Sequence, residues 1–239
     1  EKFIYSMDKE KSWRVKYSCS EIICNELCQN YSSEYNEKTF VPLMSKYLAD
    51  KEPEVKCAVL SNFEKFLKNI SLDKFKESFL PLFQSLAADT NLHVRQVYAT
   101  CLLKCIRIFK KDKQLMIDSI IPLLTKLLKD EVYEVQYSAI GNIDELILIA
   151  NESEELMTKC VLPIIEEGMK NPKWRFRLFI AENFLKVCDK LQYDKIKKFY
   201  KATIIKLFTD NAAEIREVSW NIIKTILEKV DNNYLKEEV

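Results

Sequence analysis

The chain has 239 residues, and its 37 basic and 36 acidic side chains give a formal net charge of +1. This balance argues against a strong non-specific hold on nucleic acid or on an anionic membrane, because both need a clear basic excess. Two glycines, Gly141 and Gly168, and one histidine, His93, are too few for a glycine-rich phosphate cradle or a His-rich metal or catalytic cluster. We therefore expect binding rather than catalysis, with no cofactor, no metal and no small-molecule substrate.

A short sequence motif, which we call the loop phrase, recurs about every forty residues along the chain. It starts with an acidic residue or Asn, runs through a few loop residues to an apolar residue, and usually ends on a basic one. We call the apolar residues anchors, and their spacing is 39 to 41 residues. The anchors are Val15, Val55, Val94, Val135, Phe176 and Ile215. A period of this length is typical of stacked pairs of helices, which form extended binding surfaces.

Each repeat is predicted to contain a helix A, the loop phrase and a helix B. A Pro stands thirteen residues before the anchor in four repeats, and Ala202 takes that place in the last one. We expect this Pro in the first turn of helix A or at a kink. The Asp or Asn of the loop can cap the next helix or fix the turn through its side chain. The four prolines are Pro42, Pro81, Pro122 and Pro163.

Helix B is predicted to begin near the anchor and to bury two columns of apolar residues, eight and twelve positions past it. Columns four residues apart lie on one helix face, so we expect a single buried stripe. The first column is Ile23, Phe63, Leu102, Ile143, Phe184 and Ile223. The second is Leu27, Leu67, Ile106, Ile147, Cys188 and Leu227.

A basic residue follows the anchor in five of the six repeats. These residues are Lys16, Lys56, Arg95, Arg177 and Arg216, with Gln136 as the exception. The column could form a track for a polyanion. We favour a ladder in which each basic residue pairs with the acidic residue of an adjacent loop, each exposed pair contributing about 0–1 kcal/mol.

Eight cysteines include two pairs spaced four apart, Cys24 with Cys28 and Cys101 with Cys105. Each pair would share a helix face and could be a metal or redox pair. However, no Cys-x-x-Cys occurs, and we interpret all eight as buried thiols that pack as small hydrophobes. Free thiols in this number are typical of a reducing compartment, which predicts the cytoplasm and allows the nucleus as well. No uncharged stretch approaches the ~20 residues that span a bilayer.

We interpret residues 1–239 as a single array of about six repeats. The approximate repeat boundaries are 1–34, 35–72, 73–112, 113–154, 155–192 and 193–231. Residues 1–9 look like the tail of a helix A, and nothing after Lys229 opens a complete repeat. We therefore expect a fragment of a longer array.

The repeat pattern resembles the HEAT repeat, which implies an all-α HEAT-repeat α-solenoid, a right-handed superhelix of antiparallel helix pairs. Two loop phrases, Lys11–Tyr17 (KSWRVKY) and Lys173–Leu178 (KWRFRL), are similar to loops of the scaffold (A) subunit of type 2A serine/threonine protein phosphatases. The repeat at Asp210–Lys229 resembles the one that follows the second phrase. The resemblance covers residues 8 to 230 and corresponds to the middle segment of that family's array.

This resemblance implies a scaffold that is not an enzyme. In that family a catalytic subunit binds the ridge formed by the intra-repeat loops, and an exchangeable regulatory subunit binds the ridge of earlier repeats. Trp174 and Arg175 would then face the catalytic subunit, while Trp13 and Arg14 would face the regulatory side. Trp and Arg are enriched in binding hot spots. Alternatively, Trp174 folds over its own loop and Arg175 bridges to the next acidic loop.

Two further ridge residues, His93 and Tyr133, are candidate contacts or ordinary loop surface. His93 is rejected as a catalytic base because no nucleophile partner can be identified. Two other classes of protein remain open. A tubulin-binding array of the TOG type would insert Trp13 into tubulin, and a nuclear transport receptor segment would also use helical repeats.

Overall fold

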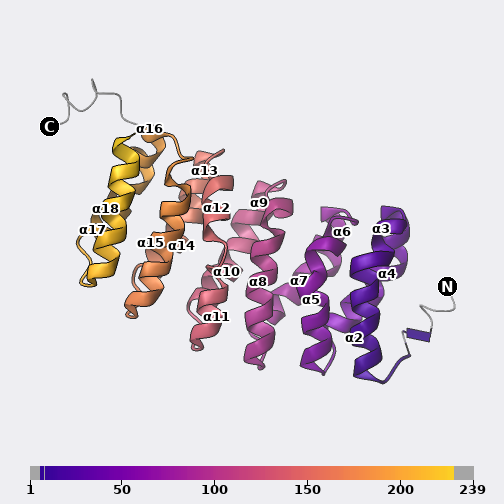
Figure 1. Cartoon of the computed structure of the whole chain (residues 1–239). Coiled ribbons are helices and arrows are strands. Elements are labelled where there is room, and N and C mark those ends of the chain that lie inside the picture. Colours follow the sequence, from indigo (N-terminus) through magenta and orange to yellow (C-terminus); the bar gives the residue numbers. More distant parts are fainter. Residues whose placement is uncertain (1–5, 8, 229–239) are drawn as a thin grey trace. The chain divides into compact units, whose positions relative to one another are not determined.

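The computed structural model describes residues 6–7 and 9–228, in which all regular secondary structure is helical (Figure 1). The chain divides into two compact units. We call Glu1–Leu115 with Pro122–Gly141 unit 1, and Met116–Ile121 with Asn142–Val239 unit 2. The predicted alternation of helices A and B is confirmed within each unit. That residues 1–239 form one array, and that the superhelix is right-handed, stay predictions.

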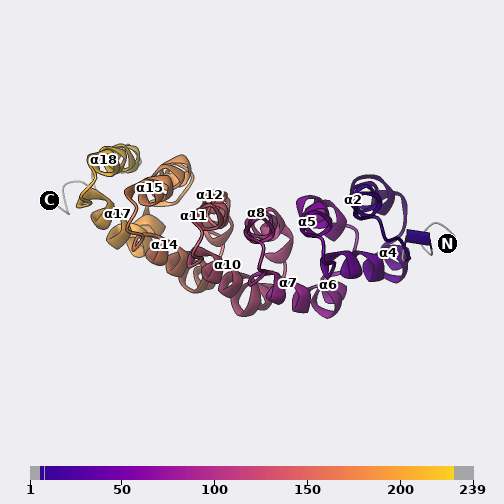
Figure 2. The same cartoon turned by 90° about the horizontal axis from the view of Figure 1, so that it is seen from below.

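Unit 1 places its B helices in one layer and its A helices in a second layer (Figure 2). The B elements are α2 (Trp13–Ile22) continued by η1 (Ile23–Leu27) and α3 (Cys28–Asn30), then α5 (Pro53–Leu67), α8 (Leu92–Phe109) and α11 (Tyr133–Ser138). The A elements are α4 (Ser33–Leu48), α6 (Leu72–Ser78) with α7 (Leu80–Leu86), α9 (Lys113–Leu115) and, apart from its first residue, α10 (Ile121–Leu128).

Unit 2, taken by itself, also has one layer of B helices and one layer of A helices (Figure 2). Its B helices are α12 (Ile143–Ala150), α15 (Trp174–Cys188) and α18 (Ala213–Leu227). Its A elements are η2 (Met116–Ile120), then α13 (Glu154–Leu156) with η3 (Met157–Val161) and α14 (Leu162–Gly168), and α16 (Tyr193–Lys195) with η4 (Ile196–Tyr200) and α17 (Lys201–Phe208). None of the helices in residues 6–7 and 9–228 is both long and apolar enough to cross a lipid bilayer.

Every helix B begins two residues before its anchor, so the predicted start is confirmed in all six repeats. The first residues are Trp13, Pro53, Leu92, Tyr133, Trp174 and Ala213. This shared register places equivalent residues of different repeats at the same point of the loop–helix junction.

Three of the four prolines lie in the first turn of a helical segment of helix A, one of the two predicted positions, and the fourth lies inside its helix. Pro42 lies inside α4, whereas Pro81, Pro122 and Pro163 are the second residues of α7, α10 and α14. Proline lacks an N–H, so the turn before it cannot complete its α-helical hydrogen bonds. Ala202 is likewise the second residue of α17 and follows η4, so the π-turn does not require proline.

Helix B of the fourth repeat is interrupted, which the apolar columns did not predict. Residues 139–142 form a turn between α11 and α12, and Asn142 has φ −124° and ψ 39°. Gly141 lies in this turn, and a glycine inside a helix costs about 1 kcal/mol relative to alanine. The sequence boundary between units 1 and 2 falls at Gly141.

The predicted buried columns are confirmed in the inner repeats and, in the first repeat, at Ile23 only, while in the last repeat neither column residue is buried. Leu102, Ile143 and Phe184 are at most 1% exposed, whereas Leu27 and Ile223 are half-buried and Leu227 is 47% exposed. In α18, Ile222 and Ile226 are buried instead, and each lies one position before the residue of the predicted column. An inner helix B such as α5 packs against the B helices α2 and α8, whereas within the described residues α18 packs against one B helix, α15, and against α17.

All eight cysteines are free and buried, as expected for thiols that pack as small hydrophobes. Burial raises the pKa of the Cys57 and Cys160 thiols to about 11. These two thiols are therefore protonated at neutral pH and poor nucleophiles. In the part of the chain that the structure describes, no three Cys, His, Asp or Glu side chains converge as a metal site.

Candidate protein-binding loops

Each intra-repeat loop is fixed by a turn in which the first side chain of the loop accepts a hydrogen bond from the backbone N–H two residues later. In unit 1 the Asp50, Asp89 and Asp130 carboxylates accept at 3.0, 2.9 and 2.9 Å, and in unit 2 Asn171 and Asp210 both accept at 3.0 Å. The acidic residue therefore fixes the turn, one of the two roles predicted for it, and the helix N-cap lies two residues further on.

The predicted ladder of ion pairs is present in unit 1. Lys16 pairs with Asp50, and Lys56 pairs with Asp89, both at 2.6 Å between Nζ and Oδ2. Arg95 binds Asp130 with two hydrogen bonds, Nε to Oδ2 at 2.7 Å and Nη2 to Oδ1 at 2.9 Å. Successive loops of unit 1 are thus held in register by side chains 33 to 35 residues apart.

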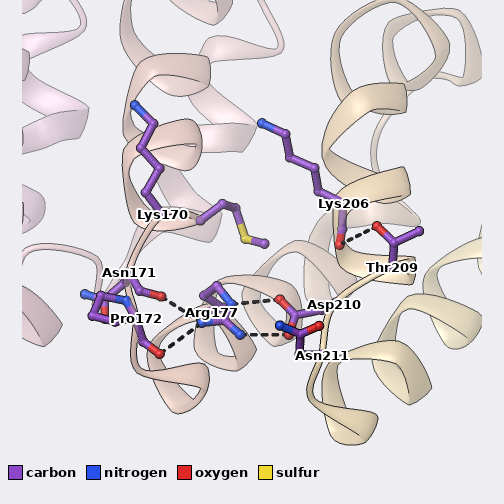
Figure 3. Close-up of a pocket in the computed structure, with 9 residues that line it drawn as sticks. Lys170, Asn171, Pro172, Arg177, Lys206, Thr209, Asp210 and Asn211 are labelled. Atoms are coloured by element: carbon purple, nitrogen blue, oxygen red, sulfur yellow. Dashed lines mark hydrogen bonds and ion pairs between the residues drawn. The ribbon is translucent and has the colours of Figure 1, made fainter.

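Unit 2 repeats this pairing with Arg177 and Asp210, whose two hydrogen bonds measure 2.7 and 2.8 Å (Figure 3). Arg177 Nη1 also donates to the carbonyl oxygens of Asn171 at 2.7 Å and Pro172 at 3.3 Å. Hydrogen bonding from Arg177 holds the pKa of Asp210 below its usual value, and Asp210 raises the pKa of Arg177. One guanidinium therefore joins two loops through charge-assisted bonds.

The two arginine–aspartate pairs are more buried than the exposed pairs that we expected from the sequence. The Arg95 and Asp130 side chains are each 9% exposed, and Arg177 and Asp210 are 13% and 7% exposed. Breaking a buried pair by removing one partner costs about 3–5 kcal/mol, against about 0–1 kcal/mol for an exposed pair. The arginine pairs lie between these limits, so they stabilise the loops more than an exposed ladder would.

The two remaining residues of the basic column, Gln136 and Arg216, donate hydrogen bonds to backbone carbonyls of their own loops. Gln136 Nε2 donates to the Asp130 carbonyl at 2.6 Å, and Arg216 Nη1 donates to the carbonyls of Asp210 and Asn211 at 2.7 and 2.9 Å. Arg95 makes the same bond to the carbonyl six residues before it. Most residues of this column are thus engaged with their loops, which favours the structural interpretation over a polyanion track.

The two Trp–Arg phrases have the same local geometry. The Arg14 guanidinium carbon lies 4.6 Å from the centre of the Trp13 ring, and that of Arg175 lies 4.7 Å from the Trp174 ring. Both Trp side chains are half-buried first residues of a helix B, and both Arg side chains are exposed. Arg175 stacks on its own Trp174 instead of bridging to the next loop, whose Asp210 carboxylate is bound by Arg177.

Tyr133 and His93 also lie at the start of a helix B, but neither belongs to a stacked Trp–Arg pair. Tyr133 is the half-buried first residue of α11, and its ring packs edge-on against Tyr137 at 4.7 Å. His93 is the exposed second residue of α8 and lines a cavity of about 200 Å³ with Gln96, Thr100 and other side chains. The candidate residues Trp13, Arg14, His93 and Tyr133 thus lie on unit 1, and Trp174 and Arg175 lie on unit 2.

A loop pocket in unit 2 was not predicted from the sequence. It has a volume of about 470 Å³, and the Arg177–Asp210 pair lies among its lining residues. Figure 3 shows Lys170 and Lys206 extending in the same direction, away from that pair. The signal that could have revealed it is the pair of lysines six and nine residues before the anchors Phe176 and Ile215.

No model of a known protein family matches the chain. A human relative, the beta isoform of the 65 kDa regulatory (A) subunit of serine/threonine-protein phosphatase 2A, is 28% identical over 108 residues, which are 44% of this chain and 18% of that protein. Human serine/threonine-protein phosphatase 4 regulatory subunit 1 is 22% identical over 232 residues, which are 94% of this chain and 24% of that protein. The chain therefore matches less than a quarter of the length of either curated relative.

Solved structures show the fold class. Cex1p superposes with a TM-score of 0.72 at 13% identity, covering 99% of this chain and 43% of Cex1p. A designed armadillo repeat protein superposes with a TM-score of 0.54 at 14% identity, covering 94% of this chain and 98% of the design. The chain is an all-helical repeat protein of the HEAT/armadillo class, and its sequence is similar to regulatory subunits of two serine/threonine phosphatases.

Proposed function

We propose that the chain is a non-catalytic scaffold of a type 2A-like serine/threonine phosphatase. The observation that carries the proposal is that 94% of the chain is similar to a regulatory subunit of phosphatase 4. The loop geometry supports it, since Trp174–Arg175 and Trp13–Arg14 display the same stacked pair at the start of a helix B. We place it in the cytoplasm, and the free thiols allow the nucleus as well.

The mechanism is positional. The catalytic subunit binds the loops around Trp174 and Arg175, and an exchangeable regulatory subunit binds the loops around Trp13 and Arg14. Holding both partners on one protein raises the effective concentration of one near the other. The stacking restricts the Arg side chain before binding, which lowers the entropy lost when a partner orders it.

The test is the affinity of the chain for the phosphatase 2A and phosphatase 4 catalytic subunits. Changing Trp174→Ala together with Arg175→Ala should weaken binding about 30-fold or more, because a hot-spot residue contributes about 2 kcal/mol or more. Trp220→Ala is the matched control, since Trp220 is a 59% exposed residue of unit 2 that lies in the middle of α18 rather than at its start, with its ring against Phe208 at 4.9 Å. Circular dichroism confirms that each variant is folded.

The folded wild-type chain binding neither catalytic subunit would refute the phosphatase proposal. Equal loss of binding in the Trp220 control would refute the role of Trp174 and Arg175. A second candidate, a TOG-type tubulin-binding array, is favoured by the position of Trp13 at the start of α2. It predicts that the chain binds αβ-tubulin and that Trp13→Ala abolishes this binding while Trp174→Ala does not.

A further inference from the structure

Two pockets occupy equivalent positions in different repeats. In unit 2 the pocket of about 470 Å³ lies between the loops at Asn171 and Asp210. In unit 1 a pocket of about 290 Å³ lies between the loops at Asp89 and Asp130. Each contains the arginine–aspartate pair that joins its two loops. The pockets are therefore two versions of one site and can be compared position by position.

Their charges are opposite. The unit 2 pocket is lined by three basic side chains and one acidic side chain, Lys170, Arg177, Lys206 and Asp210. The unit 1 pocket is lined by one basic side chain and three acidic side chains, Arg95, Asp89, Asp130 and Glu131. Counted from the anchors, Lys170, Asn171 and Asn211 correspond to Ala88, Asp89 and Glu131, whereas the counterpart of Lys206 is also a lysine, Lys126. These three substitutions account for three of the four units of charge that separate the two linings, and the fourth comes from Lys206, because Lys126 does not line the unit 1 pocket.

The lysines of the unit 2 pocket are available for a ligand. The Lys206 side chain is exposed, and within residues 6–7 and 9–228 its ammonium makes no hydrogen bond or ion pair. Lys170 lies 3.3 Å from Glu167, but its side chain is 70% exposed, and such pairs are weak. In contrast, Arg177 is already bound to Asp210 and to two carbonyls. An incoming anion can therefore be bound by the lysines without disrupting the arginine pair.

We propose that the unit 2 pocket binds an acidic segment, rich in Asp or Glu, of a protein partner. Its size falls in the range of ligand-binding clefts, about 300–1,000 Å³. Two separate ammonium groups suit carboxylates on neighbouring side chains. A phosphate is bound best by the planar fork of an arginine, and the fork here is occupied. A nucleic acid needs a longer basic surface than two lysines on a chain of net charge +1.

The experiment uses the ¹⁵N-labelled chain and a capped hexaglutamate peptide at an ionic strength of about 50 mM, where charges are only partly screened. The peptide should shift the amide resonances of residues 169–173 and 206–211. Hexaglutamine is the uncharged control, and inorganic phosphate is the competing anion. This test contains no phosphatase, so its outcome is independent of the function proposed above.

Two variants change the charges of the pockets in opposite directions, from +2 to −2 in unit 2 and from −2 to 0 in unit 1. Lys170→Glu with Lys206→Glu should weaken hexaglutamate binding about tenfold, since each exposed pair contributes up to about fivefold. Ala88→Lys with Glu131→Asn should create a second site, seen as new shifts in residues 87–91 and 129–132. All four side chains are exposed, so the variants are expected to fold.

Three results would overturn the proposal. The first is shifts that lie away from residues 169–173 and 206–211. The second is unchanged affinity in the Lys170→Glu, Lys206→Glu variant. The third is displacement of the peptide by phosphate at equal charge concentration, which would indicate a general anion site. Localised shifts with loss in the unit 2 variant and gain in the unit 1 variant would support an acidic-segment site.

Discussion

The ion pair between Arg177 and Asp210 gives the sharpest test of how the loops are held. Asp210→Asn removes the charge but keeps an oxygen for the turn to Ala212, as Asn171 does in the preceding loop. With side chains 13% and 7% exposed, this pair lies between exposed and buried pairs. We expect each of Asp210→Asn and Arg177→Met to destabilise unit 2 by about 2–3 kcal/mol.

The assay is a double-mutant cycle with the free energy of unfolding obtained from urea denaturation, supported by amide hydrogen exchange in α15 and α18. The coupling energy between the two changes should be about 1–2 kcal/mol. The Glu64–Lys68 pair is the control, because it has a similar contact distance of 2.6 Å but is 33% and 57% exposed. Its coupling should be about 0.3–0.5 kcal/mol. Equal coupling in the two pairs would refute the reasoning.

The same pair predicts a pH dependence. The folded-state pKa of Asp210 is lowered by the hydrogen bonds from Arg177, so Asp210 stabilises the fold above its unfolded pKa of about 3.9. That contribution is lost as the pH falls through the lower folded-state pKa. The stability difference between wild type and Asp210→Asn should therefore shrink below about pH 4, and a constant difference down to pH 2 would contradict the assignment.

Three further experiments test burial in the structure. Leu102→Ala should destabilise the protein by about 2–5 kcal/mol in urea denaturation, whereas Leu227→Ala, at a 47% exposed position, should cost less than about 1 kcal/mol. Gly168→Ala should destabilise by about 1–3 kcal/mol, because the added Cβ would lie 2.4 Å from Ile180 Cδ1, and Ile180→Val should restore part of the loss in thermal denaturation. Cys57, with its buried thiol of pKa about 11, should react with a thiol reagent at pH 8 only when the chain unfolds.

The local order of the helices follows from the sequence. The forty-residue period, the proline thirteen residues before the anchor and the apolar columns predicted helix A, the loop and helix B in each repeat. These features are local, because a helix face and a tight turn are set by residues a few positions apart. The interruption at residues 139–142 was missed because the apolar columns continue through it at Ile143 and Ile147.

Burial and loop pairing required the tertiary structure. Val15 and Leu227 carry the same pattern as their buried counterparts, yet they are 40% and 47% exposed, because burial depends on a neighbouring helix rather than on the pattern. Likewise, the sequence predicted an ion-pair ladder but not how far solvent is excluded from it. The stacking of Arg175 on Trp174 also depends on side-chain positions that the phrase alone does not specify.

The charge of the loop pockets shows most clearly what the sequence determines and what requires the tertiary structure. Sequence alone determined that acidic and basic residues recur at fixed distances from each anchor. Only the folded chain shows that Lys170 of one repeat and Lys206 of the next line a single pocket. Residues 36 positions apart come together because neighbouring repeats stack side by side, so each pocket combines residues from two repeats.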